Sequence, residues 1–214
     1  MHDEIHRKVF RASHERAKLD ALLDSQRFGT LSAVGEDGEP WAVPMGFARV
    51  GDLVVVHGST GGGLLRAAAG GARTVLTVAT TDGYVVGFSA EASSVNYRSA
   101  TIRGCFSRVE GDEKPTLLDA YTNFFFPGRS EEIRPHTARE LAATMLLTLP
   151  IDEDNWLYKE RTGQAVEPDE QTGAWGGVVG IRTVPQTPER APWSQADEPE
   201  SVRRLVAQIN AGRR

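Results

Sequence analysis

A glycine-rich segment that follows an apolar strand-like run has the pattern best suited to binding an anion. His57, Gly58, Ser59 and Thr60 end the run, three more glycines follow, and Arg66 comes one helical turn later. Glycines let backbone N–H groups approach a phosphate, and the hydroxyls add donors. The segment lacks the Gly-Lys-Ser/Thr of a Walker loop and the βαβ spacing of a dinucleotide fingerprint. On pattern alone, a flexible loop is an equally good interpretation.

A polar run at a strand entrance is the second candidate. Asn96, Tyr97, Arg98 and Ser99 place four hydrogen-bonding side chains in a row. In a strand, Asn96 and Arg98 face one side and the other two face the opposite side. An arginine beside amide and hydroxyl groups can hold a phosphate or a ribityl chain. A solvated strand end is the interpretation that the pattern alone favours.

Two apolar segments have the chemistry to contact a flat ring. Val43, Pro44, Met45 and Gly46 form a strand-like run in which the proline indicates an edge strand or a bulge. Free backbone groups beside a bulge can pair with the edge of a polar ring, although a simple barrel-corner bulge is the commoner case. Trp175 stands beside two glycines and can wall an aromatic ligand, but such a tryptophan is more often core or interface filler.

Composition restricts the partners and the compartment. The 214 residues carry a net charge of -5, which does not favour a nucleic-acid partner. No apolar run approaches the roughly 18 residues of a membrane span, and the charged first twenty residues predict no signal peptide, so we expect a cytoplasmic protein. The single cysteine, Cys105, is expected to be a small buried hydrophobe. The scattered histidines of the leader do not indicate a metal site.

The order of the expected elements predicts a mainly β, antiparallel fold with helical additions. Asp-Gly turn signals at 36–39 and 81–83 separate strands. Strands are expected over 28–34, 41–50, 53–56, 74–79, 84–90, 95–109, 145–149, 155–159 and 174–182. Helices are expected over 12–26, 64–69, 112–126, 137–144 and 199–211. We therefore expect one domain over 1–184, followed by a proline-rich linker and a C-terminal helix over 185–214.

The ordered series of motifs resembles the pyridoxamine-phosphate-oxidase-like, FMN-binding split-barrel proteins, nearest to the nitroimidazole-resistance branch. The series is Phe-Gly-Thr-Leu, Val-Pro-Met-Gly-Phe, His-Gly-Ser-Thr-Gly, Asn-Tyr-Arg-Ser, Pro-Gly-Arg and Trp-Gly-Gly-Val, and it spans about residues 10–182. Each motif is weak alone, but their order is specific.

This resemblance implies an antiparallel six-stranded split β-barrel that forms a homodimer with FMN at the subunit interface. Val43, Pro44, Met45 and Gly46 would then lie along the isoalloxazine edge. His57, Gly58, Ser59 and Thr60 would lie near the phosphate or ribityl chain. The remaining flavin contacts would be Asn96, Tyr97, Arg98 and Ser99, with Trp175 reaching in from the other subunit.

One departure from the family pattern concerns the phosphate. Gly62 and Gly63 stand where the family usually has a Ser-Arg or a Gly-Arg/Lys pair that grips it, and Arg66 is the nearest cation. The resemblance implies an FMN-dependent oxidoreductase that acts on a small molecule. One alternative is a non-catalytic carrier or sensor that binds a flavin, a deazaflavin or a haem, with His57 as the first axial-ligand candidate. Another is a structural dimer whose site has decayed. The substrate-binding arginine–histidine pattern of pyridoxamine-phosphate oxidase itself is not evident after Trp175.

Overall fold

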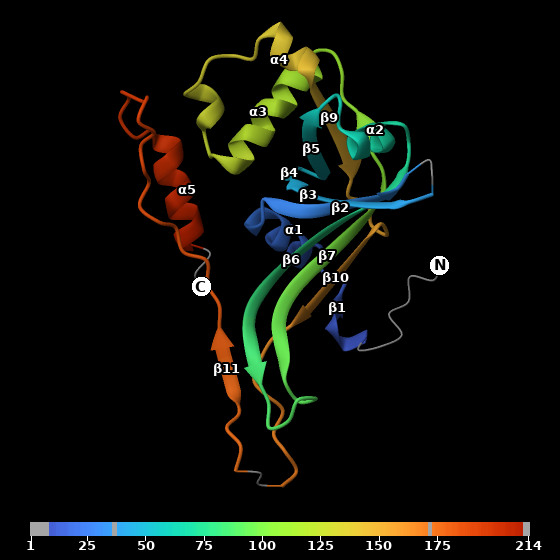
Figure 1. Ribbon diagram of the computed structural model, residues 1–214, viewed down its shortest axis with the longest axis vertical. Helices are drawn as coiled ribbons and strands as arrows, with labels where there is room; N and C mark the ends of the chain where they lie inside the picture. Colours follow the sequence, from blue (N-terminus) through green and yellow to red (C-terminus); the bar gives the residue numbers. More distant parts are fainter. Residues whose placement is uncertain (1–8, 36–37, 171–172, 212–214) are drawn as a thin grey trace.

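The computed structural model describes residues 9–35, 38–170 and 173–211, which form two antiparallel sheets with helices around them (Figure 1). The larger sheet has the order β1-β10-β7-β6-β2-β3, and β11 pairs with β6 beside it. The smaller sheet has the order β4-β5-β9-β8. Most of the expected charged leader, and half of the turn signal at 36–39, lie outside the described residues.

The strands and helices alternate irregularly along the chain. The strands are β1 (Ala12–Ser13), β2 (Phe28–Val34), β3 (Pro40–Gly46), β4 (Ala48–Val50), β5 (Leu53–Ser59), β6 (Arg73–Val86), β7 (Ser94–Cys105), β8 (Ser107–Arg108), β9 (Thr144–Pro150), β10 (Trp156–Arg161) and β11 (Gly177–Gly180). The helices are α1 (Arg16–Ser25), α2 (Gly63–Ala69), α3 (Glu113–Phe125), α4 (Ala138–Ala143) and α5 (Glu200–Ala211), with short 3-10 turns η1 (Val9–Arg11) and η2 (Arg129–Glu131).

The predicted mainly β, antiparallel split-barrel class is confirmed, although the barrel is not closed. Within the described residues, the strand pairings leave the two sheets separate, with β3 at an edge of the larger one. A closed barrel has no edge strand, whereas an edge strand leaves backbone donors and acceptors unpaired along one side. The outer side of β3 is therefore a surface that can receive another molecule.

The smaller sheet is buried on both faces. One face packs with α1, α2 and the larger sheet in the main core, and the other face packs against α3. Val54 and Val56 belong to the main core, and Val55 between them belongs to the α3 side. Because successive side chains point to opposite faces, a strand covered on both sides needs apolar residues at every position. This explains the uninterrupted Val54–Val56 run.

The expected strand 41–50 is two strands in different sheets, so that expectation was wrong in one respect. Phe47 is fully buried between β3 and β4, and its N–H donates to the carbonyl of Arg27 at 3.2 Å. This anchor redirects the chain from the larger sheet to the smaller one. Pro44 lies in the edge strand β3, where its missing N–H costs no ladder bond, as its sequence context predicted.

The expected turn at 81–83 is a bulge inside the single long strand β6. The pairing between β6 and β7 shifts register between Thr81 and Gly83. The intervening Asp82 carboxylate accepts two hydrogen bonds from Arg98 on β7, at 2.7 and 2.9 Å. An Asp-Gly pair can make a bulge as well as a turn, and here the bond across the ladder and the pairing with β11 keep the strand continuous.

Two further sequence expectations have clear outcomes. Cys105 is exposed at the end of β7, so the prediction of a buried hydrophobe was wrong.

The C-terminal helix forms as predicted, and its Ser201 N–H and hydroxyl both donate to the carboxylate of Glu132 beside η2. Of the helices described, none is long and apolar enough to cross a membrane.

The tip of the β6–β7 hairpin gives a test of the fold. A Cβ added at Gly87 would lie 2.4 Å from the backbone carbonyl carbon of Ala92, and backbone yields less readily than a side chain. We expect Gly87→Ala to lower the free energy of unfolding by about 1–3 kcal/mol. Gly180→Ala in β11 is the matched control, because a Cβ there meets nothing within 4 Å. Urea unfolding of both variants would show the difference, and equal stability would contradict the described tip.

Candidate functional site

The alternation of β5 places His57 on the same side as Val55, facing α3. The imidazole ring meets the ring of Tyr121 edge to face, with centroids 4.5 Å apart and planes at 84°. The rest of the His57 side chain is exposed to solvent. One side of the imidazole is thus fixed by protein and the other is open to a ligand.

The surroundings of His57 favour its neutral form. Burial of the ring against α3 lowers the pKa of His57 below its ordinary value. Among the described residues, its ring nitrogens have no hydrogen-bond partner. At neutral pH one of these nitrogens therefore carries a free lone pair, which is the form of histidine that coordinates a metal.

β3 approaches the same place through Gly46. A Cβ at this position would lie 2.7 Å from the Tyr121 Oη atom and 3.1 Å from the Phe125 ring, so a side chain there would separate β3 from α3. The rings of Tyr121 and Phe125 stack with centroids 4.9 Å apart. Phe124 continues the row, with its ring centroid 6.0 Å from that of Phe125. We call His57, Tyr121, Phe125 and Phe124 the aromatic row.

Tyr121 contributes a protonated hydroxyl to this row. The side chain is buried at its ring, and burial raises the pKa of Tyr121 to about 12. The phenol therefore keeps its proton at neutral pH. Its hydroxyl makes no hydrogen bond within the described part of the chain, so it remains available as a donor close to Gly46.

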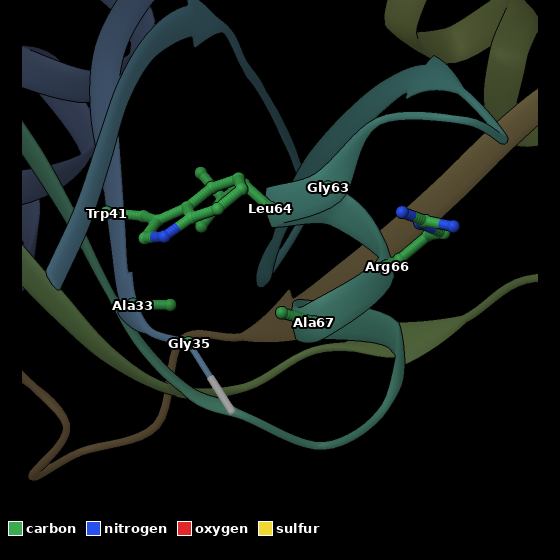
Figure 2. Close-up of a pocket in the computed structure, with 7 residues that line it drawn as sticks. All are labelled: Ala33, Gly35, Trp41, Gly63, Leu64, Arg66 and Ala67. Carbon is green, nitrogen blue, oxygen red and sulfur yellow. The ribbon is translucent and has the colours of Figure 1, made fainter. Parts of the chain in front are cut away.

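An open groove of about 590 Å³ lies between the start of β3 and α2 (Figure 2). A Cβ at Gly63 would lie 2.7 Å from the Trp41 ring, so the glycine makes room for the indole. In Figure 2 the indole points toward α2, whereas the Arg66 guanidinium projects away from it. The groove is lined by Ala33, Gly35, Trp41, Gly63, Leu64, Arg66 and Ala67.

The loop between β5 and α2 is tied to the protein by its own polar groups. The N–H of Gly61 donates to the Ser59 hydroxyl at 3.2 Å, and the N–H of Thr60 donates to the carbonyl of Ala143 at 3.3 Å. A Cβ at Gly58 would lie 2.5 Å from the Leu65 side chain, so this glycine allows α2 to pack on β5. The predicted anion loop is thus an ordered connection beside His57.

The polar run on β7 already has partners inside the chain. The Asn96 side chain donates to the carbonyl of Gly163 at 2.9 Å and accepts from the Arg161 guanidinium. Arg98 forms the bidentate pair with Asp82, and this hydrogen-bonded carboxylate raises the pKa of Arg98. The Ser99 hydroxyl donates to the carbonyl of Lys159 at 3.4 Å.

The folded chain brings together only part of the predicted site. Val43–Gly46, His57–Thr60 and Arg66 lie around the aromatic row and the groove. The run Asn96–Ser99 lies toward the tip of the long β6–β7 hairpin, which extends away from β5 and α2 (Figure 1). Trp175 is on the same extension, 67% exposed and packed over Gly177 where β11 pairs with β6.

Sequence reasoning missed the contribution of α3 to this site. Tyr121 and Phe125 are four residues apart and therefore share one helix face, a spacing that is visible in the sequence. What the sequence does not display is that this face packs on β5 next to His57.

Comparisons with known proteins agree with this fold. The family described as pyridoxamine 5'-phosphate oxidase matches residues 15–155. An FAD and haem binding protein from Mycobacterium smegmatis is 44% identical, with a TM-score of 0.88, over 91% of this chain and 97% of that one. A flavocytochrome from Azotobacter vinelandii is 29% identical, with a TM-score of 0.87, over 94% of each chain.

A more distant structure shares the fold alone. It is a Bacteroides thetaiotaomicron protein provisionally assigned to 5-nitroimidazole antibiotic resistance, with 17% identity and a TM-score of 0.58 over 69% of this chain and 85% of that one. No curated protein matches the chain.

The neutral state of His57 predicts a pH dependence of stability. Because the folded-state pKa of His57 lies below its unfolded value of about 6.5, the unfolded chain binds the proton first as the pH falls. The contribution of neutral His57 is therefore complete above about pH 6.5 and is lost as the pH falls toward the folded-state pKa.

The measurement is the free energy of unfolding in urea at about pH 7.5 and about pH 5.5. We expect His57→Gln to reduce the loss of stability between the two values. His136→Gln, which removes a histidine hydrogen-bonded to Asp119 instead, is the control and should leave the His57 contribution in place. An unchanged pH dependence in the His57 variant would contradict the assignment.

Proposed function

The chain belongs to the pyridoxamine 5'-phosphate oxidase family, and from this premise we propose that it is a redox protein that binds a flavin and a haem. The observation that carries the proposal is His57, whose neutral ring is fixed on one side by Tyr121 and open on the other. A relative of 44% identity over nearly the whole of both chains binds FAD and haem, which supports the same pair of ligands here.

The surroundings of His57 fit a haem. Neutral imidazole is a common axial ligand of haem iron. The edge-to-face contact with Tyr121 holds the ring plane, as an orienting neighbour of a metal ligand should. The half-buried rings of Phe124 and Phe125 offer an apolar surface for a planar macrocycle, and the buried ring of Tyr121 supports them from behind.

The outer edge of β3 fits a flavin. Val43 is 40% exposed there, and the strand has free backbone groups on that side. The glycine at position 63 makes room for Trp41, so one of the two positions that usually grip the FMN phosphate serves to pack the indole. This favours FAD over the FMN that the sequence suggested, because FAD does not depend on a terminal phosphate clamp at that point.

A bound flavin would supply one- and two-electron chemistry and a haem one-electron chemistry, so the chain would pass electrons to or from a small molecule. The protein supplies binding, orientation and exclusion of water. Trp41 and α2 close one side of the groove, and α3 closes the far side of His57. The Tyr121 hydroxyl holds a proton beside His57 at neutral pH.

We propose that the cofactors lie at a homodimer interface. The exposed edge of β3 and the exposed Trp175 on the hairpin extension are both apolar surfaces, and they lie on different parts of the protomer. In a two-fold dimer the extension of one protomer can reach the β3 edge of its partner, which would complete the site that one protomer leaves divided.

Removal of the imidazole tests the haem ligand. We expect His57→Ala, reconstituted with haem, to lose the Soret band of the wild-type complex while it keeps bound flavin absorbance. His136→Ala is the matched control, because its ring is part-buried and bonded to Asp119. A wild-type spectrum without either cofactor would refute the proposed function. If the wild type shows flavin absorbance but no Soret band, the protein binds a flavin without a haem. The wavelength of the flavin absorbance band would then distinguish a flavin from a deazaflavin.

A charge on β3 tests the dimer. We expect Val43→Lys to convert a dimeric protein to a monomer, because a lysine in an apolar interface loses hydration without a partner. Ile133→Lys, at a position 42% exposed between η2 and α4 and outside both proposed surfaces, is the control and should remain dimeric. Light scattering after size exclusion gives the masses. A monomeric wild-type protein, or a dimeric Val43→Lys, would contradict the interface.

A further inference from the structure

Arg27 occupies the junction of three elements beside the aromatic row. It connects α1 to β2, and its guanidinium carbon lies 5.4 Å from the ring centroid of Phe124 on α3. Its Nη2 donates to the Gln208 side chain on α5 at 3.0 Å. Its carbonyl accepts from Phe47, the anchor between the sheets, so the backbone position is fixed.

The charge of Arg27 has no carboxylate partner within the described residues. Asp24, three residues earlier, is bound by Arg49 at 2.6 and 2.8 Å. Arg16 and Arg98 likewise bind carboxylates directly. Arg27 differs from these three arginines because a neutral amide and an aromatic face are its neighbours.

A second observation is the unused donor of this guanidinium. The Nε atom of Arg27 is buried and has no hydrogen-bond partner. Burial lowers the pKa of Arg27, which shows that its surroundings cost the cation hydration. A desolvated cation with a free N–H is stabilised by any acceptor that reaches it, and most by a charged one.

The aromatic row leads from this cation to His57. The centroid of Phe124 lies 6.0 Å from that of Phe125, Phe125 lies 4.9 Å from Tyr121, and Tyr121 lies 4.5 Å from His57. A planar ligand against the half-buried rings of Phe124 and Phe125 would lie between a neutral imidazole and a cation. Both cofactors of the proposed function carry anionic groups at their rims: carboxylates on haem and phosphates on FAD.

We propose that Arg27 binds an oxyanion, a carboxylate or a phosphate, of the cofactor that lies against the aromatic row. This inference rests on the proposed function and names Arg27 as the residue that binds the anionic groups of the cofactor. A role in holding α5 alone does not account for the site, because the Gln208 amide accepts from Nη2 and leaves Nη1 without a partner among the described residues.

The test compares ligands that carry anionic groups with neutral ligands that share the same ring system. Iron protoporphyrin IX is paired with its dimethyl ester, and FAD is paired with riboflavin. Dissociation constants are measured for the wild type, Arg27→Gln and Arg27→Lys, with circular dichroism to confirm that each variant folds. Gln208→Ala removes the contact with α5 but keeps the cation, and Arg203→Gln removes an α5 arginine bound to Glu200.

We expect Arg27→Gln to raise the dissociation constant of one charged ligand by about ten- to a hundredfold, because a charge-assisted hydrogen bond is lost. Its neutral counterpart should bind the variant as it binds the wild type. An effect on iron protoporphyrin IX identifies a carboxylate, and an effect on FAD identifies a phosphate. Arg27→Lys should weaken the same ligand less, and the two α5 variants should bind like the wild type.

Two results would overturn the assignment. One is equal weakening of the charged and neutral members of both pairs, and the other is no effect of Arg27→Gln on a ligand that the wild type binds. A wild type that binds none of the four probes refutes the proposed function itself, and the assignment of Arg27 with it. The wild-type measurement alone therefore separates the two failures.

Discussion

Strand β5 is covered on both faces, and this packing determines where the chemistry of the molecule lies. The alternation of side chains sends Val54 and Val56 into the main core and Val55 toward α3. The next residue on the α3 side is His57, which therefore meets Tyr121 at the point where the apolar cover ends. A shift of one residue along β5 would direct the histidine into the main core, where an imidazole has no access to a ligand.

The sequence predicted the fold class and most element positions because those depend on local patterns and motif order. It did not predict that 41–50 divides between two sheets, because that depends on the burial of Phe47 and its bond to Arg27. It also took Asp82-Gly83 for a turn, since the same dipeptide serves turns and bulges and only the partner strand decides. Cys105 was predicted to be buried, but its strand ends at the surface and the side chain is exposed.

The sequence predicted the residues of the candidate site that lie on strands, but not those that lie on helices or beside them. The residues of β3 and β5 were found through motif order, whereas Tyr121, Phe125 and Arg27 come from segments distant in sequence. The sequence shows Gly63 only as a departure from the family pattern, because its contact with Trp41 exists only in the folded chain. The polar run on β7 was recognised, but its internal bonds to Gly163 and Asp82 arise only in the folded hairpin.

The pairing of β5 with β9 has a consequence for how the molecule folds. These strands are separated in the chain by α2, the long β6–β7 hairpin, α3 and α4, whereas β6 and β7 are joined by a short turn. Pairing of strands distant in sequence costs more chain entropy and is slower than hairpin formation. The β6–β7 hairpin should therefore form early and the β5–β9 pairing that positions His57 late, so that ligand binding at His57 follows closure of the loop between β5 and β9.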